Sequence, residues 1–245
     1  MLEISDLHKS YENLRAVDGV SLSVPTGAIV GLIGPNGSGK STLMSLIAGT
    51  QRSDSGSIRV NEEEISHLPP NRIFQRGVVR SFQDPSLIFR MSTLDNALLA
   101  AHPQRGERPL ASPWRRLWRK QEEAHTRAAL TIFDHLKLRH QYNKPAADLS
   151  GGQMKLLEIG RAMAGEPKLL LLDEPTAGVA PALAHDIFVE IANLREKHGL
   201  TILVVEHRLE ILFAFVDFLY VLHLGKVIAT GTPAEISANA LVKEV

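Results

Sequence analysis

The sequence of 245 residues contains no cysteine. This absence excludes disulfide frameworks, thiol nucleophiles and cysteine-ligated metals, and it is compatible with a reducing compartment. Long apolar runs are also missing, because the best candidate, Leu209–Leu224, is interrupted by charged residues and is too short to span a membrane. Residues 1–9 lack the basic start and apolar core of a signal peptide. We therefore expect that, if the protein works at a membrane, another subunit holds it there.

Net charge is absent as well, since Lys and Arg number 27 and Asp and Glu also number 27. No global field therefore favours nucleic acid or an anionic membrane, and binding to either would need a local patch. The shares of hydrophobic residues, 44%, and of charged residues, 22%, are ordinary for a soluble globular protein. The length allows one large domain or two small ones with a substantial buried core.

Hydrophobic patterns toward the two ends of the chain predict an α/β core. Continuous aliphatic runs are typical of strands that are buried on both faces of a parallel sheet. Helical spacing at Ser41–Ala48 and Pro181–Lys197 places helices after or between such runs, so strands and helices are expected to alternate. The expected strands are Leu2–Leu7, Val20–Val24, Ala28–Ile33, Lys168–Leu172 and Thr201–Val205.

The middle of the chain has a different pattern. Helical periodicity covers Thr93–Ala101, Gln121–Leu138 and Gly151–Ala164, and strand signals are few. The segment Gln104–Pro113 is rich in Pro, Arg and Gly and is predicted to be a loop. We therefore expect an α/β core formed by residues 1–83 and 166–245, and a helical insertion formed by residues 84–165.

The strongest chemical signal is a glycine-rich loop between an aliphatic strand and a helix, with the spacing G-x-x-x-x-G-K-S. Its glycines allow the backbone to turn N–H groups inward around phosphate oxygens, and the following helix adds its positive N-terminal end. In such a loop the Lys40 ammonium reaches the β- and γ-phosphates, and the Ser41 hydroxyl binds Mg²⁺. The alternative is a chance glycine-rich turn, which the flanking strand and helix disfavour. The candidate nucleotide-binding residues are Gly34, Pro35, Asn36, Gly37, Ser38, Gly39, Lys40, Ser41 and Thr42.

Two adjacent acids follow the aliphatic run that ends at Leu172. A carboxylate at the carboxyl end of a parallel strand lies at the edge where ligands bind in open α/β sheets. Asp173 is therefore a candidate Mg²⁺ ligand, and Glu174 is a candidate base that polarises the attacking water. Taken alone, a buried strand ending in acids is more often structural, but the phosphate loop in the same chain favours the catalytic interpretation.

A third motif, Leu149-Ser150-Gly151-Gly152-Gln153, stands just before a predicted helix and suits a second anion cradle. An ordinary helix cap would explain Ser150 but not the combined spacing of the three motifs. With all three, the chain resembles the ABC ATPase family over nearly its whole length. The resemblance implies an α/β fold, a phosphate-loop NTPase core of the RecA type with an N-terminal antiparallel β region and an inserted α-helical subdomain.

The resemblance also implies roles for single residues. Two cassettes pack head to tail, and the signature loop at 149–153 of each closes on the ATP that the other holds. Tyr11 matches the aromatic residue that stacks on adenine, although a lone Tyr is more often a packing residue. Gln83 matches the glutamine that senses Mg²⁺, water and the transport partner, and His207 matches the histidine that contacts the γ-phosphate. The implied catalytic residues are Glu174, His207, Gln83 and Lys40, the implied metal ligands are Ser41, Gln83 and Asp173, and the implied cofactors are ATP and Mg²⁺.

Two positions depart from the family's pattern. Where the family commonly has Leu-Asp-Pro after the acids, this chain has Val179-Ala180-Pro181, and Ala180 has no side chain to hydrogen-bond across a dimer. Either that aspartate is dispensable in this branch or communication between the two ATP sites is weaker, and the sequence leaves both open. The second departure is Arg208, which stands where cassettes of one importer subgroup, those for branched-chain amino acids and related solutes, often have aspartate.

Segments 79–87, 155–161 and 205–207 resemble the cassettes of importers for branched-chain amino acids and of their relatives for urea or amides. This resemblance implies an ATPase subunit that powers import from the cytoplasmic face of the plasma membrane, as a peripheral protein. The implied partners are a second cassette, identical or not, transmembrane permease subunits and, indirectly, a substrate-binding protein, with no nucleic acid. The alternatives are a lipid or polysaccharide exporter cassette and a non-transport ABC ATPase acting on ribosomes or DNA. The single motif set without heptads disfavours the second.

One further segment, residues 105–120, holds six basic residues and both tryptophans of the chain. A solvated helix face is the most common explanation for such a run. Contact with lipid headgroups or with the membrane partner is the second explanation, and nucleic acid is the third.

Overall fold

The computed structural model describes residues 1–81 and 86–243, and the chain divides into two units. The first unit contains the described residues of Met1–Gln83, Lys168–Ala177 and Ala184–Val245. The second unit contains the described residues of Asp84–Pro167 and Gly178–Leu183.

The aliphatic runs of the sequence form the centre of a six-stranded sheet in the first unit, with the strand order β10-β9-β3-β8-β7-β6. All neighbouring pairs in this sheet are parallel except β9 and β10. Every residue of β3, β7 and β8 is buried, as expected for strands covered on both faces. The strands are β3 (Ile29–Ile33), β6 (Val78–Arg80), β7 (Leu169–Asp173), β8 (Thr201–Val205), β9 (Phe218–His223) and β10 (Lys226–Gly231).

A second, antiparallel sheet has the order β2-β1-β4-β5, formed by β1 (Leu2–Tyr11), β2 (Leu14–Val24), β4 (Ser55–Val60) and β5 (Glu63–Glu64). The first two strands are longer than their sequence pattern predicts. The register between β1 and β2 shifts at three places, after Ile4, after Leu7 and after Lys9. Each shift interrupts the alternation of buried and exposed side chains. Pattern analysis therefore detects only the regular part of each strand.

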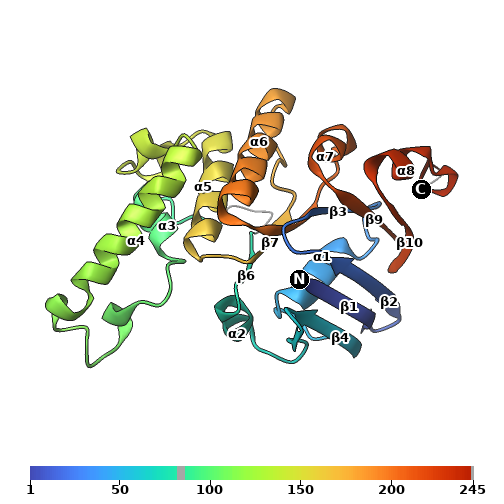
Figure 1. Ribbon diagram of the computed structural model, residues 1–245, viewed down its shortest axis with the longest axis horizontal. Coiled ribbons are helices and arrows are strands. Elements are labelled where there is room, and N and C mark those ends of the chain that lie inside the picture. Colours follow the sequence, from blue (N-terminus) through green and yellow to red (C-terminus); the bar gives the residue numbers. More distant parts are fainter. Residues whose placement is uncertain (82–85, 244–245) are drawn as a thin grey trace. The chain divides into compact units, whose positions relative to one another are not determined.

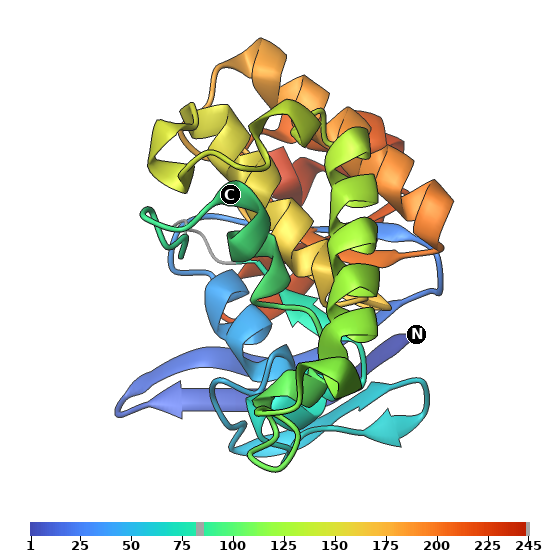
Figure 2. The same cartoon turned by 90° about the vertical axis from the view of Figure 1, so that its left-hand side faces the viewer.

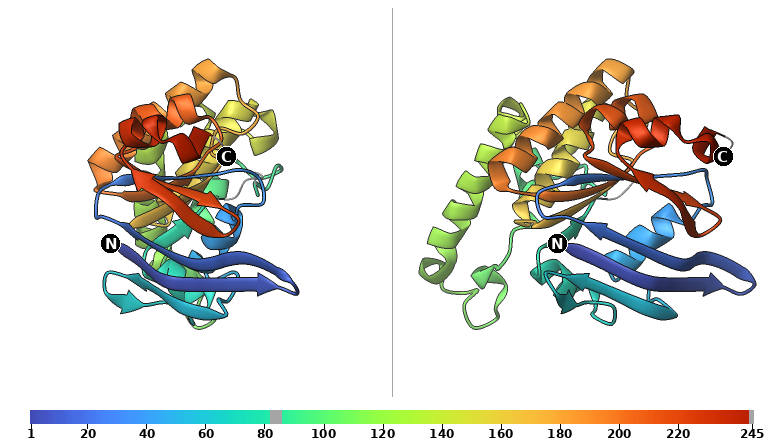
Figure 3. Two further views of the ribbon diagram at one scale, coloured as in Figure 1. Left: turned by 90° about the vertical axis from the view of Figure 1, so that its right-hand side faces the viewer. Right: turned by 45° about the vertical axis from the view of Figure 1, so that its right-hand side comes forward.

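Helix α1 (Lys40–Ile47) lies between the two sheets and fills the main core of the first unit (Figures 1 and 3). Leu43, Met44 and Ile47 are fully buried on it, and they belong to the same apolar cluster as Leu2 of β1 and Leu203 of β8. Because both sheets depend on α1 for burial, the start of this helix is held firmly at the end of β3. Helix α2 (Pro70–Gln75) precedes β6.

The remaining helices of the first unit are α6 (Pro181–His198, from Ala184 onward), α7 (Leu209–Phe215), α8 (Pro233–Ala238) and α9 (Ala240–Lys243). Phe188 of α6 stacks on Phe215 of α7 with ring centroids 5.5 Å apart. Helix α7 approaches β3 closely, since a Cβ on Gly31 would lie 3.2 Å from the Leu212 side chain. Within the described part of the chain, no helix is long and apolar enough to cross a membrane.

The second unit is helical, as its periodicity predicts. Helices α3 (Thr93–Leu98), α4 (Arg115–His135) and α5 (Gly151–Ala164) pack side by side (Figure 2). Single 3-10 turns, η1 (Arg105–Glu107), η2 (Arg139–Gln141) and η3 (Ala146–Asp148), lie in the connections. The expected helix start at Gln121 is wrong, because α4 begins at Arg115. Arg and Lys are good helix formers, and the apolar stripe continues through Trp118 and Trp114 at helical spacing. The expected loop at residues 104–113 contains η1 and otherwise no helix or strand.

Candidate functional site

The glycine-rich loop joins β3 to α1, and the backbone of the first unit passes very close to it. Gly34 has φ 146°, and a Cβ there would lie 2.0 Å from the Leu222 carbonyl oxygen. Gly39 has φ 103°, and a Cβ there would lie 2.2 Å from the Ala16 carbonyl oxygen. Only glycine satisfies both the dihedral angle and the space at these two positions. The loop is therefore a tightly fitted structure, and α1 follows it directly.

Lys40, the first residue of α1, turns its side chain back into the loop. Its Nζ donates hydrogen bonds to the carbonyl oxygens of Gly34 at 2.8 Å and Pro35 at 2.9 Å. Burial lowers the pKa of the Lys40 ammonium below its ordinary value, while the carboxylates of Glu174 and Asp173 act in the opposite direction. The loop thus holds a largely buried cation within the electrostatic reach of two acids.

A cavity of about 370 Å³ opens in front of the loop. Tyr11 stands at it with 41% of its surface exposed, and the Lys9 ammonium lies 5.5 Å from the centroid of the Tyr11 ring. The Tyr11 hydroxyl donates to the side-chain oxygen of Gln51. An aromatic ring tethered at its hydroxyl and exposed at a cavity is suited to stacking on a base. The described residues that line the cavity all belong to the first unit: Tyr11, Leu14, Ala16, Asn36, Gly37, Ser38, Gly39, Lys40, Ser41, Thr42, Glu174 and His207.

Asp173 ends β7 and pairs with a residue that sequence reasoning missed. The Arg80 Nη2 donates to the Asp173 Oδ2 at 2.7 Å, and the two side chains are only 12% and 3% exposed. The Arg80 Nη1 donates to the Ser45 hydroxyl on α1 at 2.8 Å. A basic residue inside the otherwise apolar strand β6 is the sequence signal that could have marked Arg80 as a candidate site residue.

The second oxygen of Asp173 bears on the predicted metal site. Its Oδ1 is buried and has no hydrogen-bond partner within the described residues. A buried carboxylate oxygen that accepts no hydrogen bond is suited to binding a cation. No cluster of three or more His, Cys, Asp or Glu side chains that would hold a metal occurs in the described part of the chain. Mg²⁺ usually takes one or two protein ligands together with substrate phosphates and water. Asp173, together with the exposed Ser41 at the start of α1, therefore fits Mg²⁺.

Glu174 and His207 meet at the ends of two neighbouring strands. Parallel pairing sets Asp173 opposite Val205, so the residues just beyond β7 and β8 lie next to one another. The His207 Nε2 and the Glu174 Oε1 are 2.9 Å apart. Glu174 has φ 49°, and its N–H donates to the Val205 carbonyl at 2.9 Å. The left-handed turn holds the Glu174 carboxylate at the cavity beside Lys40.

Glu206 is a second residue that sequence reasoning missed. It is buried, and its Oε1 accepts from both the N–H, at 3.0 Å, and the hydroxyl of Thr176. Its Oε2 accepts from the His207 N–H at 2.9 Å. Glu206 therefore ties the turn after β7 to the turn after β8 and positions His207. The signal was available, since an acid directly after an aliphatic strand is the pattern that selected Asp173.

The signature loop at residues 149–153 belongs to the second unit, where it caps α5. Ser150 is the N-cap, its hydroxyl accepts from the Gln153 N–H at 3.3 Å, and the Gln153 side chain accepts from the Ser150 N–H at 2.9 Å. Gly151 is exposed with nothing within 4 Å of an added Cβ, whereas a Cβ on Gly152 would lie 2.2 Å from the Leu183 side chain. The loop is thus a formed capping box with an open face at Gly151. Gln83, expected at the metal, lies outside the described residues.

Three charged residues of α5, of which Lys155 and Glu158 are buried, hold the segment that begins at Ser86. Arg161 donates to the Ser86 carbonyl at 2.6 Å, and the Ser86 N–H bonds to Glu158. Lys155 pairs with Glu158 at 3.5 Å, with both side chains buried. Burial raises the pKa of the Glu158 carboxyl above its ordinary range, and Lys155 and Arg161 counteract this only in part.

Comparison with known proteins gives consistent matches. The sequence model of the ABC transporter family matches residues 17–177. The chain is 43% identical over 241 residues to a "Probable branched-chain amino acid transport ATP-binding protein LivG" of Methanocaldococcus jannaschii, covering 98% of this chain and 93% of that protein. It is 36% identical over 240 residues to the high-affinity branched-chain amino acid transport ATP-binding protein BraF of Pseudomonas aeruginosa, covering 98% and 94%.

Among solved structures, the ADP conformation of an ATP-binding cassette of an ABC transporter superposes with a TM-score of 0.87 at 41% identity, covering 100% of this chain and 97% of that chain. This match confirms the expected fold class, an α/β phosphate-loop NTPase core with an antiparallel sheet and a helical subdomain.

Proposed function

Because the chain belongs to the ABC transporter family, as an ATP-binding cassette, we propose that it powers the import of branched-chain amino acids or of a related amino acid, amide or urea. It is an ATPase whose hydrolysis is coupled to transport across a membrane. The observation that carries the proposed substrate is the match along almost the full chain to branched-chain amino acid transport ATP-binding proteins. The permease and the binding protein, which are separate subunits, would select among these small solutes.

The cavity beside the glycine-rich loop is the proposed ATP site. Its shape is set by the loop backbone, and its charge is set by Lys40, whose Nζ would exchange the Gly34 and Pro35 carbonyls for phosphate oxygens. The Tyr11 ring at the same cavity would stack on adenine. The loop residues other than Pro35, which has no N–H group, would turn their backbone N–H groups toward phosphate oxygens.

Asp173 and Ser41 would hold Mg²⁺, with Gln83 as a further ligand expected from the sequence. When bound, Mg²⁺ supplies positive charge that neutralises the phosphate oxygens during phosphoryl transfer. Arg80 holds one oxygen of Asp173, and this leaves the buried Oδ1 for the cation.

Hydrolysis follows from the placement of Glu174 and His207. Glu174 accepts a proton from the water that attacks the γ-phosphorus, and the bond from that phosphorus to the β–γ bridging oxygen breaks to give ADP and phosphate. The His207 Nε2 lies 2.9 Å from the Glu174 Oε1 and orients this base, and the His207 ring would contact the γ-phosphate. Lys40 stabilises the negative charge that spreads over the transferred group.

Two cassettes working as a dimer would complete the machine. Dimeric cassette structures exist in the family. The exposed face of the capping box at Ser150 and Gly151 would close on the ATP of a second cassette, identical or not. Transmembrane permease subunits and, through them, a substrate-binding protein are the further partners, at the cytoplasmic face of the membrane.

Reconstitution tests the proposed substrate. The cassette, its permease subunits and the binding protein are placed in proteoliposomes, and ATP hydrolysis is measured with leucine, isoleucine, valine, an amide or urea. We expect one of these solutes to stimulate both hydrolysis and its own uptake, and the Glu174→Gln variant to abolish both. A complex that hydrolyses ATP but responds to none of these solutes would contradict the substrate assignment and leave the ATPase assignment intact.

A further inference from the structure

The segment of residues 105–120, called here the basic–aromatic segment, concentrates positive charge in a chain whose net charge is zero. It holds six basic residues and a single acid, Glu107. All six basic side chains are exposed: Arg105, Arg108, Arg115, Arg116, Arg119 and Lys120. The segment thus supplies the local patch without which neither an anionic membrane nor nucleic acid would be attracted.

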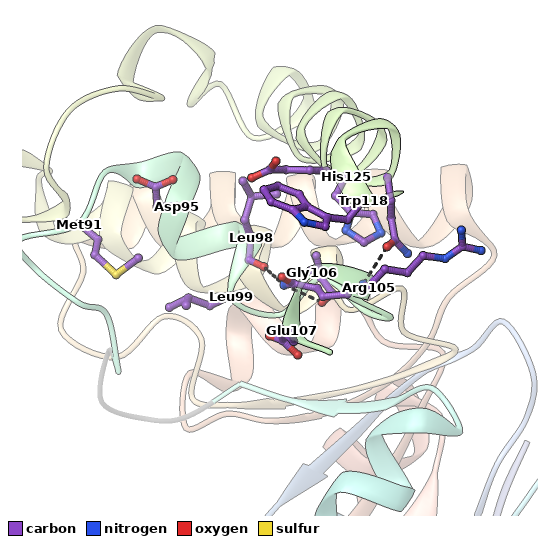
Figure 4. A pocket seen from close by; sticks show the side chains of 13 residues that line it. Met91, Asp95, Leu98, Leu99, Arg105, Gly106, Glu107, Trp118 and His125 are labelled. Carbon is purple, nitrogen blue, oxygen red and sulfur yellow. Dashed lines mark hydrogen bonds between the residues drawn. The ribbon is translucent and has the colours of Figure 1, made fainter. Parts of the chain in front are cut away.

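The basic–aromatic segment is folded and is not a loose tail. The Trp118 Nε1 donates to the Ser112 carbonyl at 3.1 Å, and a Cβ on Gly106 would lie 3.3 Å from the Trp118 ring. Trp118, Gly106 and Leu98 line a pocket of about 420 Å³ behind the segment (Figure 4). Trp118 therefore fixes the part of the segment around Gly106 and Ser112 against the first turns of α4.

Unlike Trp118, three large apolar side chains of the segment are exposed on its outer surface. Leu110 is 91% exposed, Trp114 67% and Leu117 58%. Trp114 and Leu117 are three residues apart at the start of α4, so they share one face. At 100° per residue the basic residues Arg115, Arg116, Arg119 and Lys120 fall on the remaining arc. The start of α4 is thus amphipathic. On its apolar arc Trp118 lines the pocket, whereas Trp114 and Leu117 stay exposed to water.

Most of these positive charges also form no close ion pair, although the Arg115 charge helps to lower the pKa of the Glu123 carboxyl. Arg119 pairs with Glu123 at 2.7 Å. Among the residues that the structure describes, Arg108, Arg115, Arg116 and Lys120 form no ion pair within 4 Å. Four unpaired cations around an exposed Trp and two exposed Leu side chains fit a surface that is anionic outside and apolar beneath.

We propose that the basic–aromatic segment binds the anionic headgroups of a phospholipid membrane, with Trp114 and Leu117 entering the interface. The ring of Trp114 suits the boundary between headgroups and acyl chains, and Arg and Lys side chains reach from such a position to phosphates. Nucleic acid would use the cations but gains little from exposed aliphatic side chains. The inference rests on the surface chemistry of the second unit and does not depend on the transported substrate.

Vesicle binding tests the proposal with the full-length protein. Sedimentation is measured with vesicles of phosphatidylcholine alone and of phosphatidylcholine with phosphatidylglycerol. We expect binding only to the second kind. Raising the salt from about 0.1 M to about 1 M shortens the Debye length from about 10 Å to about 3 Å and should release the protein.

Two variants and a matched control identify the surface. Arg115→Gln/Arg116→Gln/Lys120→Gln should weaken vesicle binding about 100-fold, because each basic residue near an anionic surface strengthens binding about fivefold. Trp114→Ser/Leu117→Ser should weaken it at least about tenfold. The control Arg52→Gln/Arg59→Gln/Lys197→Gln removes three exposed charges from the first unit and should leave vesicle binding unchanged. ATP hydrolysis in solution should be the same in all variants and shows that each is folded.

Tryptophan fluorescence gives an independent readout, because the chain has two tryptophans and both lie in the segment. In a Trp118→Phe protein, emission from Trp114 should shift to the blue with phosphatidylglycerol vesicles and be quenched by brominated lipid. Failure of the wild-type protein to bind anionic vesicles, or equal loss in the control, would overturn the proposal. Binding of a single-stranded oligonucleotide without vesicle binding would overturn it in favour of nucleic acid. Normal ATP hydrolysis in either case would leave the proposed function standing.

Discussion

The Arg80 guanidinium donates to the Asp173 carboxylate across 2.7 Å, and water has little access to either side chain. The same guanidinium donates to Ser45 on α1, so one side chain connects β6, the end of β7 and the helix that follows the glycine-rich loop. Asp173 is thereby held by one oxygen, while its buried Oδ1 has no hydrogen-bond partner in the described part of the chain. We infer that Arg80 positions the carboxylate for a cation without touching the nucleotide.

Replacing Arg80 should therefore affect both stability and the response to Mg²⁺. Arg80→Met leaves a buried carboxylate without its counter-ion, and we expect a loss of about 3–5 kcal/mol in the free energy of unfolding. Urea denaturation followed by circular dichroism measures this. The control Arg76→Met breaks an exposed pair with Glu63 at 2.9 Å, which should cost only about 0–1 kcal/mol. Equal losses of stability in Arg80→Met and Arg76→Met would contradict the positioning role. In a second variant, Arg80→Lys, ATP binding is titrated at several Mg²⁺ concentrations. A Mg²⁺ dependence equal to that of the wild type would contradict the role as well.

The Glu174→Gln variant separates ATP binding from hydrolysis. The amide keeps the size of the side chain and can still hydrogen-bond to His207, but it cannot accept the proton of the attacking water. We expect turnover to fall by about 10²- to 10⁴-fold, with ATP affinity unchanged and a dimer that persists in ATP. ATPase assays, nucleotide titration and size-exclusion chromatography measure the three quantities. Undiminished turnover would remove Glu174 from its role as the base.

The two glycines at 34 and 37 should differ in their tolerance of a methyl group. In Gly34→Ala the new Cβ would lie 2.0 Å from the Leu222 carbonyl oxygen, so the loop has to move. We expect a stability loss of about 2–4 kcal/mol and at least about tenfold weaker ATP binding. Gly37 has φ 78° but nothing within 4 Å of an added Cβ, so Gly37→Ala should cost about 1–2 kcal/mol. Equal effects in nucleotide titration and urea denaturation would show that the loop is not tightly fitted.

Glu158 should make the stability of the second unit depend on pH. Burial raises the pKa of this carboxyl in the folded protein, so its contribution to stability is present below the unfolded pKa of about 4.3. That contribution is lost as the pH rises through the folded pKa. The free energy of unfolding of the wild type should therefore fall relative to Glu158→Gln over this range. Urea unfolding followed by the fluorescence of Trp114 and Trp118, both in the second unit, measures it, and parallel pH profiles would exclude this effect.

Much of the site could be predicted because its chemistry is local. The glycine-rich loop, the acids after β7 and the cap at Ser150 each occupy a few consecutive residues, and their backbone geometry depends on those residues. Boundaries were less predictable. The start of α4 was placed at Gln121 because basic residues hide the apolar stripe of Trp114 and Trp118, and the bulges in β1 hid half of that strand.

A sequence signal could mark Arg80 and Glu206 as unusual residues, but the partner that each one contacts could not be predicted from one sequence. Arg80 and Asp173 are 93 residues apart and meet only because β6 pairs with β7 in the register that sets Arg80 opposite Leu171. Glu206 reaches Thr176 across 30 residues because β7 pairs with β8 in the register that sets Asp173 opposite Val205. A shift of either register would move these side chains to other neighbours.

The sequence by itself determined which chemical groups are present and where each meets its own backbone: the phosphate loop, the paired acids and the signature cap. Only the tertiary structure decided which buried charges neutralise one another, because strand register and the packing around α1 bring distant residues together. The same holds for the basic–aromatic segment. Its charge was visible in the sequence, but only the folded second unit turns Trp118 inward and leaves Trp114 and Leu117 in water.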